Sequence, residues 1–294
     1  MNRLCRVVWA STILSTAALC YSQAQFTQAC PNPNFPSPAQ TVADGACPRV
    51  GTGGDEASQN AAKNNFCAPL GPQASPVLPV SFQTFMKLQA KVVQDGSINF
   101  GNPKKPVQDR RELGQMGEGR LVSLIGYVLI ARQEGAESVN CGRNVPNAAA
   151  RHDIHISLVA VRREQNECHS VVVEMSPHHR PAQWTAAIVE RLAHANTPVR
   201  VTGQMFFDSS HLPCDENGGI GHNPKRFSLW EIHPIYKFEV CTANCNTPNR
   251  VWKDLTQLVN AEVLVVPDNK QNRPGHRTLA QKKASANTSL IISH

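Results

Sequence analysis

The sequence predicts a mainly β fold, because five segments have the period-two alternation or the β-branched composition of strands and one helical segment interrupts them. A helical pattern that starts at Pro181 falls between the third and the fourth strand-like segment. The predicted order of elements is therefore β-β-β-α-β-β. The five strand-like segments span residues 120–132, 153–161, 171–175, 199–208 and 229–241.

The first two strand segments carry the most informative patterns. Residues 120–132 (RLVSLIGYVLIAR) form a long β-rich run that contains Gly126, and a glycine inside such a run predicts a bulge or a sharp bend. Residues 153–161 (DIHISLVAV) alternate, which places Asp153, His155 and Ser157 on one face and aliphatic side chains on the other. The second strand is expected to present a polar face and an apolar face.

The helical segment is expected to begin at Pro181, because proline favours the first position of a helix. Trp184, Ile188 and Leu192 follow at i, i+4 and i+8 and form one apolar stripe. Asn196 ends the pattern, and the fourth strand follows.

A helix between the third and fourth of five strands is the connectivity of the OB barrel. A long first strand bent at Gly126 fits this architecture, because one strand can then pair on both sides of a small closed barrel and remove its exposed edges. The sequence predicts an OB-like five-stranded barrel with flanking helices and a disulfide-pinned N-terminal extension. A generic five-stranded α+β sheet is the alternative.

The first 24 residues have the pattern of a cleavable signal peptide. Arg3 and Arg6 precede an apolar run, and small residues precede the expected cleavage after Ala24. The alternatives are a membrane anchor and a lipoprotein, but the apolar run is shorter than the roughly 20 residues that a spanning helix needs, and Leu19 stands before Cys20, where a lipobox needs a small residue. A secreted or periplasmic protein is expected, with no transmembrane segment after cleavage.

Composition divides the mature chain into four parts. Residues 25–80 predict an irregular Cys- and Pro-rich segment with one short helix over 55–65. Residues 81–245 begin with an amphipathic helix and contain all the predicted strands. Residues 246–265 predict a C-terminal helix, and residues 266–294 a basic disordered tail.

The mature chain would keep an even set of cysteines, which in an exported protein favours disulfides. A zinc site is the weaker interpretation, because no Cys-x-x-Cys pair is present. The pairing is not deducible from the sequence. The candidates are Cys30, Cys47, Cys67, Cys141, Cys168, Cys214, Cys241 and Cys245.

The charge of +7 gives little support to nucleic-acid binding, because most of it lies outside the predicted domain. Subtracting the +2 of the leader and the +4 of residues 266–294 leaves +1 for residues 25–265. A sequence-independent phosphate binder usually has a basic face. Nucleic acid is therefore a candidate partner that the charge of the body does not favour.

Nine of the eleven histidines fall between residues 152 and 233, and histidine is both the commonest metal ligand and an acid–base near neutral pH. The preferred candidate site joins the end of the fourth strand to the start of the fifth. There His211 and His233, with Asp208 or Glu231, would hold one divalent metal ion, zinc first, which would lower the pKa of a bound water to about 7 for attack on an ester or phosphodiester. Glu231 or Asp208, whichever is not coordinated, would be the catalytic base.

A second candidate cluster contains Asp153, His155 and Glu174, at the start of the second strand and the end of the third. In an ideal barrel the two clusters lie at opposite ends, on the order of 17 to 20 Å apart. Strand tilt or a bulge at Pro234 would be needed to bring them together. The alternative for both clusters is a set of loop and edge residues in ordinary hydrogen bonds.

Four further residues are candidates for contact with a ligand. Arg180 and Arg200 could neutralise an anionic substrate, and Trp230 and Tyr236 could stack on bases or sugars, as aromatic residues of OB domains do. The two aromatic residues alternate with polar residues along the fifth strand, which also fits a place in the core or on the barrel face.

The strings VRVTGQMFFDSSHLPC and LWEIHPIYKFEVC resemble segments of uncharacterised secreted bacterial proteins with an OB-fold-like domain, over roughly residues 81 to 245. The resemblance implies an exported bacterial protein and carries over no catalytic residues. The sequence thus favours an exported domain that binds an oligomeric or anionic ligand, such as nucleic acid, a saccharide or a protein. A metal-dependent hydrolase, of the phosphodiesterase or nuclease kind, and a structural envelope protein are the alternatives.

Overall fold

The computed structural model of the 294-residue chain describes residues 51, 56–64, 77–102, 107, 109–135, 137, 139, 151–215, 217–219 and 221–260. The predicted signal peptide and the predicted basic tail lie outside these residues. So do four of the candidate disulfide cysteines, namely Cys30, Cys47, Cys67 and Cys141.

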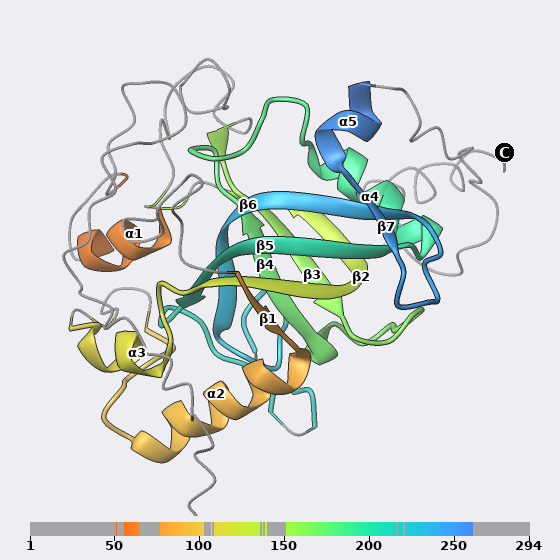
Figure 1. The fold of residues 1–294 in the computed structure, drawn as a ribbon. Helices are drawn as coiled ribbons and strands as arrows, with labels where there is room; N and C mark the ends of the chain where they lie inside the picture. The colour runs from red at the N-terminus through yellow and green to blue at the C-terminus, as the bar shows by residue number, and fades with distance from the viewer. Residues whose placement is uncertain are drawn as a thin grey trace, which may run out of the picture.

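Seven strands of the described residues form one mixed sheet (Figure 1). Hydrogen bonds connect them in the order β1-β2-β3-β4-β6-β5, β7 pairs with β6, and β5 also pairs with β2. The predicted strand–helix order is confirmed for β2 to β6, and β1 and β7 are additions. The strands are β1 (Leu78–Val80), β2 (Leu121–Gln133), β3 (Ile154–Val159), β4 (Ser170–Met175), β5 (Pro198–Phe207), β6 (Trp230–Ala243) and β7 (Val251–Asp254).

Helices flank the strands, with α2 below them and α4 and α5 above them in the view of Figure 1. Ser81 and Thr84 form a reciprocal capping box at the start of α2, which is why that helix begins where the sequence pattern predicts. The helices of the described residues are α1 (Ala57–Lys63), α2 (Phe82–Asp95), α3 (Arg111–Met116), α4 (Ala186–Ala195), α5 (Leu255–Asn260) and a short 3-10 helix (Glu167–His169).

The helix between the third and fourth predicted strands starts five residues later than expected. Pro181 lies in a turn that the Trp184 backbone N–H closes on its carbonyl oxygen. The Thr185 side chain then accepts a hydrogen bond from the Ile188 N–H and caps α4, which begins at Ala186. Trp184 therefore precedes the helix, and it is buried in the core rather than part of a helical stripe.

The C-terminal helix predicted over residues 246–265 is wrong in its first half. Residues 251–254 alternate between exposed and half-buried positions and form β7, which pairs with β6. The Cys241–Cys245 disulfide joins the end of β6 to the turn before β7, and the Arg200 guanidinium stacks 4.8 Å from the centre of the Trp252 ring. A four-residue strand has too short a pattern to be recognised without its partner.

The long strand β2 pairs on both sides, as its glycine suggested. Residues 121–127 pair with β5, and residues 127–133 pair with β3. At Gly126 a Cβ atom would stand 3.0 Å from the Phe82 ring and 3.0 Å from the Val159 carbonyl oxygen. Glycine at this position lets α2 and β3 approach the strand closely.

Strand β6 reaches β4 as well as β5. It pairs with β5 in antiparallel fashion, with register shifts around Gly203, and with β4 in parallel at Val173 and Ile232. This parallel contact decides the geometry of the candidate site.

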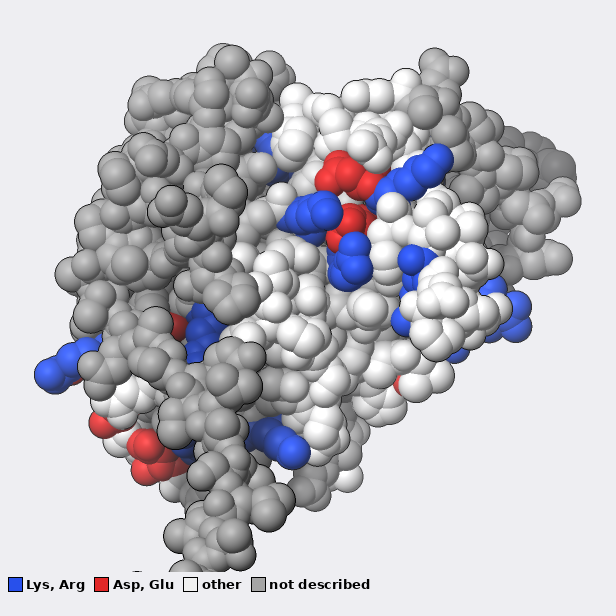
Figure 2. Space-filling model, in the orientation of Figure 1, with Lys and Arg blue, Asp and Glu red and all other residues white. Residues whose placement is uncertain are grey.

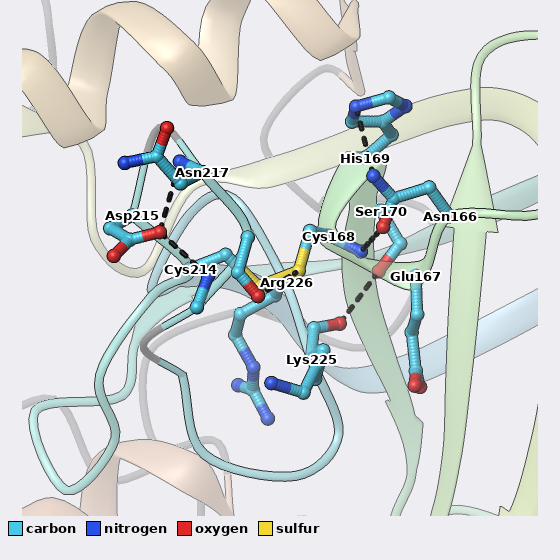
Figure 3. The surroundings of a disulfide bond; sticks show 12 residues. Asn166, Glu167, Cys168, His169, Ser170, Cys214, Asp215, Asn217, Lys225 and Arg226 are labelled. Atoms are coloured by element: carbon cyan, nitrogen blue, oxygen red, sulfur yellow. Dashed lines mark hydrogen bonds between the residues drawn. A yellow bond between two sulfur atoms is a disulfide. The ribbon is translucent and has the colours of Figure 1, made fainter.

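The expectation of disulfides is confirmed for the four described cysteines. Cys168–Cys214 ties the start of β4 to the loop between β5 and β6 (Figure 3). In that loop the Asp215 carboxylate accepts hydrogen bonds from the backbone N–H groups of Asn217 and Gly219. The cross-link therefore holds down a loop that also supplies side chains to the candidate site.

The apolar core lies between the sheet and the helices, and β3 and β4 are buried along their whole length. Within the described part of the chain, none of the helices has the length and apolarity that crossing a membrane requires. The two disulfides are compatible with an oxidising compartment.

Candidate functional site

The two predicted His/carboxylate clusters meet in one place. His155 and Glu174 are register partners on β3 and β4, with 3.1 Å between His155 Nε2 and Glu174 Oε2. His233 Nε2 on β6 lies 2.9 Å from the same carboxylate oxygen. Both imidazoles thus contact one oxygen atom, and the expectation that the clusters lie a strand length apart is wrong.

The parallel pairing of β4 with β6 explains this convergence. Val173 is opposite Ile232, so Glu174 and His233, one residue further along, point to the same side of the sheet. In the ideal barrel used for the prediction, the end of the fourth predicted strand and the start of the fifth lie far from the end of the third predicted strand, which is β4. In the structure β6 pairs with β4 close to its own start, so the start of β6 lies beside the end of β4.

Asp153, just before β3, completes this half of the cluster. Its Oδ2 atom lies 3.5 Å from His233 Nε2. Asp153 Oδ1 and Glu174 Oε1 are buried and make no hydrogen bond, whereas Glu174 Oε2 faces the two imidazoles. Buried carboxylate oxygens without hydrogen bonds are costly, so this part of the cluster has the capacity to bind a cation.

The other half of the cluster follows from the end of β5. Asp208 Oδ2 lies 2.7 Å from His211 Nδ1. Glu231, at the start of β6, contacts the guanidinium of Arg226, and both side chains are fully buried. His211 and Asp208 are therefore a pair, as predicted, whereas His233 lies with Asp153 and Glu174 and not in the predicted set with His211.

Lys63, at the end of α1, links the two halves. Its ammonium nitrogen lies 3.8 Å from Glu174, 3.7 Å from Asp208 and 3.5 Å from Glu137, and its side chain is 4% exposed. The His233 Nδ1–H donates to the Lys63 carbonyl oxygen over 2.7 Å. Sequence reasoning missed Lys63, because a lysine in a short polar helix has the pattern of a solvent-exposed residue.

The cluster reaches solvent beside His155. His155 Nδ1 lies 3.4 Å from Glu134 and Nε2 lies 3.7 Å from Glu137. The side chains of these two glutamates are 25% and 29% exposed, whereas those of Glu174 and His233 are fully buried. Access from water is therefore from the end of β2.

The two imidazoles carry protons at neutral pH when no metal is bound. Burial alone would lower the pKa of each, but the Glu174 carboxylate outweighs it and raises the pKa of His155 to about 9 and that of His233 to about 10. Burial would raise the pKa of Glu174, yet His155, Lys63 and His233 hold it well below its usual value.

The carboxyl groups of Asp208 and Glu231 have opposite tendencies. Burial opposes ionisation of Asp208, but His211 and Lys63 hold its pKa well below the usual range. The pKa of Glu231 is raised well above its usual value by burial and by the Glu174 charge, although Arg226 acts in the other direction. Such a divergence is typical of sites with separate acid and base roles.

Three overlapping groups of residues have ligand atoms within 4.8 Å of one another. Two ligands of a tetrahedral zinc ion, each at about 2.0–2.1 Å from it, lie about 3.3 Å apart. The 2.9 Å and 3.5 Å separations from His233 to Glu174 and Asp153 bracket that value. The groups are Glu137–Asp153–His155, Asp153–Glu174–His233 and Glu174–Asp208–Glu231.

The four candidate ligand-contact residues all have partners within the protein, and Arg180 also interacts electrostatically with Asp153 of the cluster. Arg180 is buried and donates to the carbonyl oxygens of Trp184 and His152. Trp230 is fully buried and packs edge-on against Phe207.

The remaining two candidates also have protein partners. Arg200 forms a two-pronged ion pair with Glu239 over 2.6 and 2.8 Å, and the Tyr236 ring packs against the ring of His179. Figure 2 shows acidic and basic side chains next to each other over the β5, β6 and β7 region rather than a continuous basic stripe. These residues form no common stacking or anion-binding surface.

Comparison with protein-family models, with curated proteins and with solved structures gives no match for this chain.

Proposed function

We propose that this protein is an exported, divalent-metal-dependent hydrolase in which Asp153, Glu174 and His233 bind the metal ion. The observation that carries the proposal is the convergence of these three side chains, from β4, from β6 and from the residue before β3, to distances suited to one ion. Two of their buried oxygen atoms, Asp153 Oδ1 and Glu174 Oε1, have no hydrogen bond. A divalent ion would satisfy those oxygens. It would also supply a Lewis acid and a water of lowered pKa.

The protein's own residues divide the remaining roles. The Asp208–His211 pair would accept the proton of the attacking water, because Asp208 stays ionised. The leaving oxygen would take a proton from solvent water as the ester bond breaks. Lys63 would hold the carboxylates in place and neutralise developing negative charge.

Two features support the proposed OB-type barrel and the proposed export. The pairing order β2-β3-β4-β6-β5, with β5 returning to β2 and α4 between β4 and β5, agrees with a closed barrel of the OB type. The disulfides and the predicted leader agree with export.

The hydrolase is better supported than a binding domain for an anionic ligand, which the sequence favoured. The described cluster is rich in buried carboxylates, and Trp230 and Arg200 are engaged in contacts within the protein. A structural envelope protein would not need a cluster of buried carboxylates.

The test is the metal content of the mature, oxidised protein purified without a His tag. After chelation and reloading with Zn²⁺ or Mn²⁺, wild type should retain at least one equivalent, and its Tm should rise, because ligand that binds only the folded state stabilises it. His233→Gln should lose this ion, whereas His169→Gln, at an exposed position, should keep it.

Activity screens with p-nitrophenyl esters and bis-p-nitrophenyl phosphate would follow. Absence of bound metal and of any Tm shift in wild type would refute the proposal, whatever the folding of the variant. Metal binding without turnover of any ester would leave a metal-binding structural protein as the better explanation.

A further inference from the structure

We propose that the cluster holds a second divalent cation, bound by Glu137, Asp153 and His155, and that the pair of ions makes phosphate esters the substrate class. Asp153 would bridge the two ions. This inference rests on the proposed function, since it extends the same metal site.

The geometry of Asp153 supports a bridging role. It is the one residue shared by the Glu137–Asp153–His155 and Asp153–Glu174–His233 groups, each of which has its ligand atoms within 4.8 Å. Its Oδ2 faces His233 at 3.5 Å, while its buried Oδ1 makes no hydrogen bond. One oxygen for each ion is how a carboxylate joins two metals about 3.5–4 Å apart.

His155 has the environment of a metal ligand rather than of a simple ion-pair partner. Its Nδ1 lies 3.4 Å from Glu134, and its Nε2 faces Glu174 at 3.1 Å and Glu137 at 3.7 Å. A carboxylate on one ring nitrogen commonly orients a histidine whose other nitrogen binds a metal. Glu134 would then be the positioning residue for the second ion.

The balance of charge links the second ion to an anionic substrate. Six carboxylates belong to the connected cluster, and Glu231 is the protonated one. The other five face the permanent positive charges of Lys63, Arg226 and Arg180, the last of which interacts electrostatically with Asp153, and this leaves −2 when the histidines are neutral. One divalent cation would cancel this charge, and a second would leave +2. The six carboxylates are Glu134, Glu137, Asp153, Glu174, Asp208 and Glu231.

The charge balance also defines the substrate. With one ion the cluster is neutral, whereas with two ions it carries +2 and attracts a phosphate anion. The second ion would lie beside the partly exposed Glu137, on the side that solvent reaches. Water would form the new P–O bond and give its proton to the Asp208–His211 pair, and the ester P–O bond would break as the leaving oxygen takes a proton from solvent water.

The test is a Mn²⁺ titration of the full mature protein, followed by metal analysis after desalting and by EPR spectroscopy. Wild type should bind two equivalents, and the second should convert the isolated six-line signal into a broadened, spin-coupled spectrum. Glu137→Gln should bind one equivalent with an isolated signal. Glu137 is partly exposed, so this variant is expected to fold, which near-UV circular dichroism checks.

The matched control is Glu164→Gln, which removes a partly exposed carboxylate paired with His169 and should leave both equivalents in place. If wild type binds one equivalent of Mn²⁺ and Glu137→Gln binds the same, the proposed second cation is refuted, but the proposed hydrolase is not. Zero equivalents in wild type would overturn both. Two equivalents with an uncoupled spectrum would refute the bridge at Asp153.

Discussion

Replacement of Lys63 by methionine tests how strongly the cluster depends on its buried cation. Lys63→Met keeps the length of the side chain but leaves Glu137, Glu174 and Asp208 without the ammonium group that lies 3.5–3.8 Å from them. Removing one partner of a buried ion pair costs about 3–5 kcal/mol. Because the lysine side chain is only 4% exposed, we expect a loss in this range from the free energy of unfolding of the metal-free protein.

The direction of the pH dependence follows from the same contacts. Burial alone would lower the pKa of Lys63, but Glu174, Glu137 and Asp208 raise it well above the usual 10.5. The folded protein therefore holds this proton more tightly than the unfolded chain. The stabilisation is fully present below about pH 10.5 and is lost as the pH rises further.

Urea unfolding at pH 7.5 in EDTA, followed by tryptophan fluorescence, measures the loss. Lys87→Met, at an exposed position on α2, is the control and should change stability by no more than about 0.5 kcal/mol. Added Mn²⁺ should narrow the difference between Lys63→Met and wild type, because the metal then neutralises the same carboxylates. A loss below about 1 kcal/mol in EDTA would refute the interpretation of Lys63 as an essential counter-charge.

Three further predictions concern parts of the fold around the site. The Cys168→Ser/Cys214→Ser variant should lose up to about 4 kcal/mol, since the bond closes a loop across 46 residues, and an unchanged urea midpoint against oxidised wild type would contradict this. In wild type the free energy of unfolding should fall between pH 6 and pH 4, and in His179→Gln the slope of this fall should be smaller by about 1.4 kcal/mol per pH unit. Burial, together with His178, lowers the pKa of His179 to about 3, so the unfolded chain takes up this proton first as the pH falls through 6.5; equal slopes in the two proteins would count against it. Trp230→Ala should cost about 3–5 kcal/mol in urea unfolding and weaken the near-UV spectrum, because the indole fills the core; a cost under 1 kcal/mol would indicate a surface role instead.

The order of the elements could be predicted because each of the central strands and α4 carries its own local pattern. Gly126 correctly marked the place where β2 changes partners. The start of α4 was misplaced because a threonine cap at residue 185 prevails over Pro181. The strand containing Trp252 was missed because its hydrogen bonds are with β6, and a pattern of four residues does not reveal that partner.

The candidate site shows the same limit in another form. Each of Asp153, His155, Glu174 and His233 could be selected from its residue type and its place on a strand. Their meeting could not, because it depends on the parallel β4–β6 contact and on its register, which sets Ile232 opposite Val173. Lys63 carries no local signal at all, since its burial comes entirely from the docking of α1 on the sheet.

An anomalous-difference map from a crystal grown with Mn²⁺, recorded at the manganese edge, tests the central claim most directly. The account predicts a peak within about 2.3 Å of His233 Nε2 and of carboxylate oxygens from Asp153 and Glu174. Such a peak would establish the metal centre independently of any assay of activity. A map with manganese peaks only at surface carboxylates, and with Lys63 still closing an ion-free cluster, would contradict it.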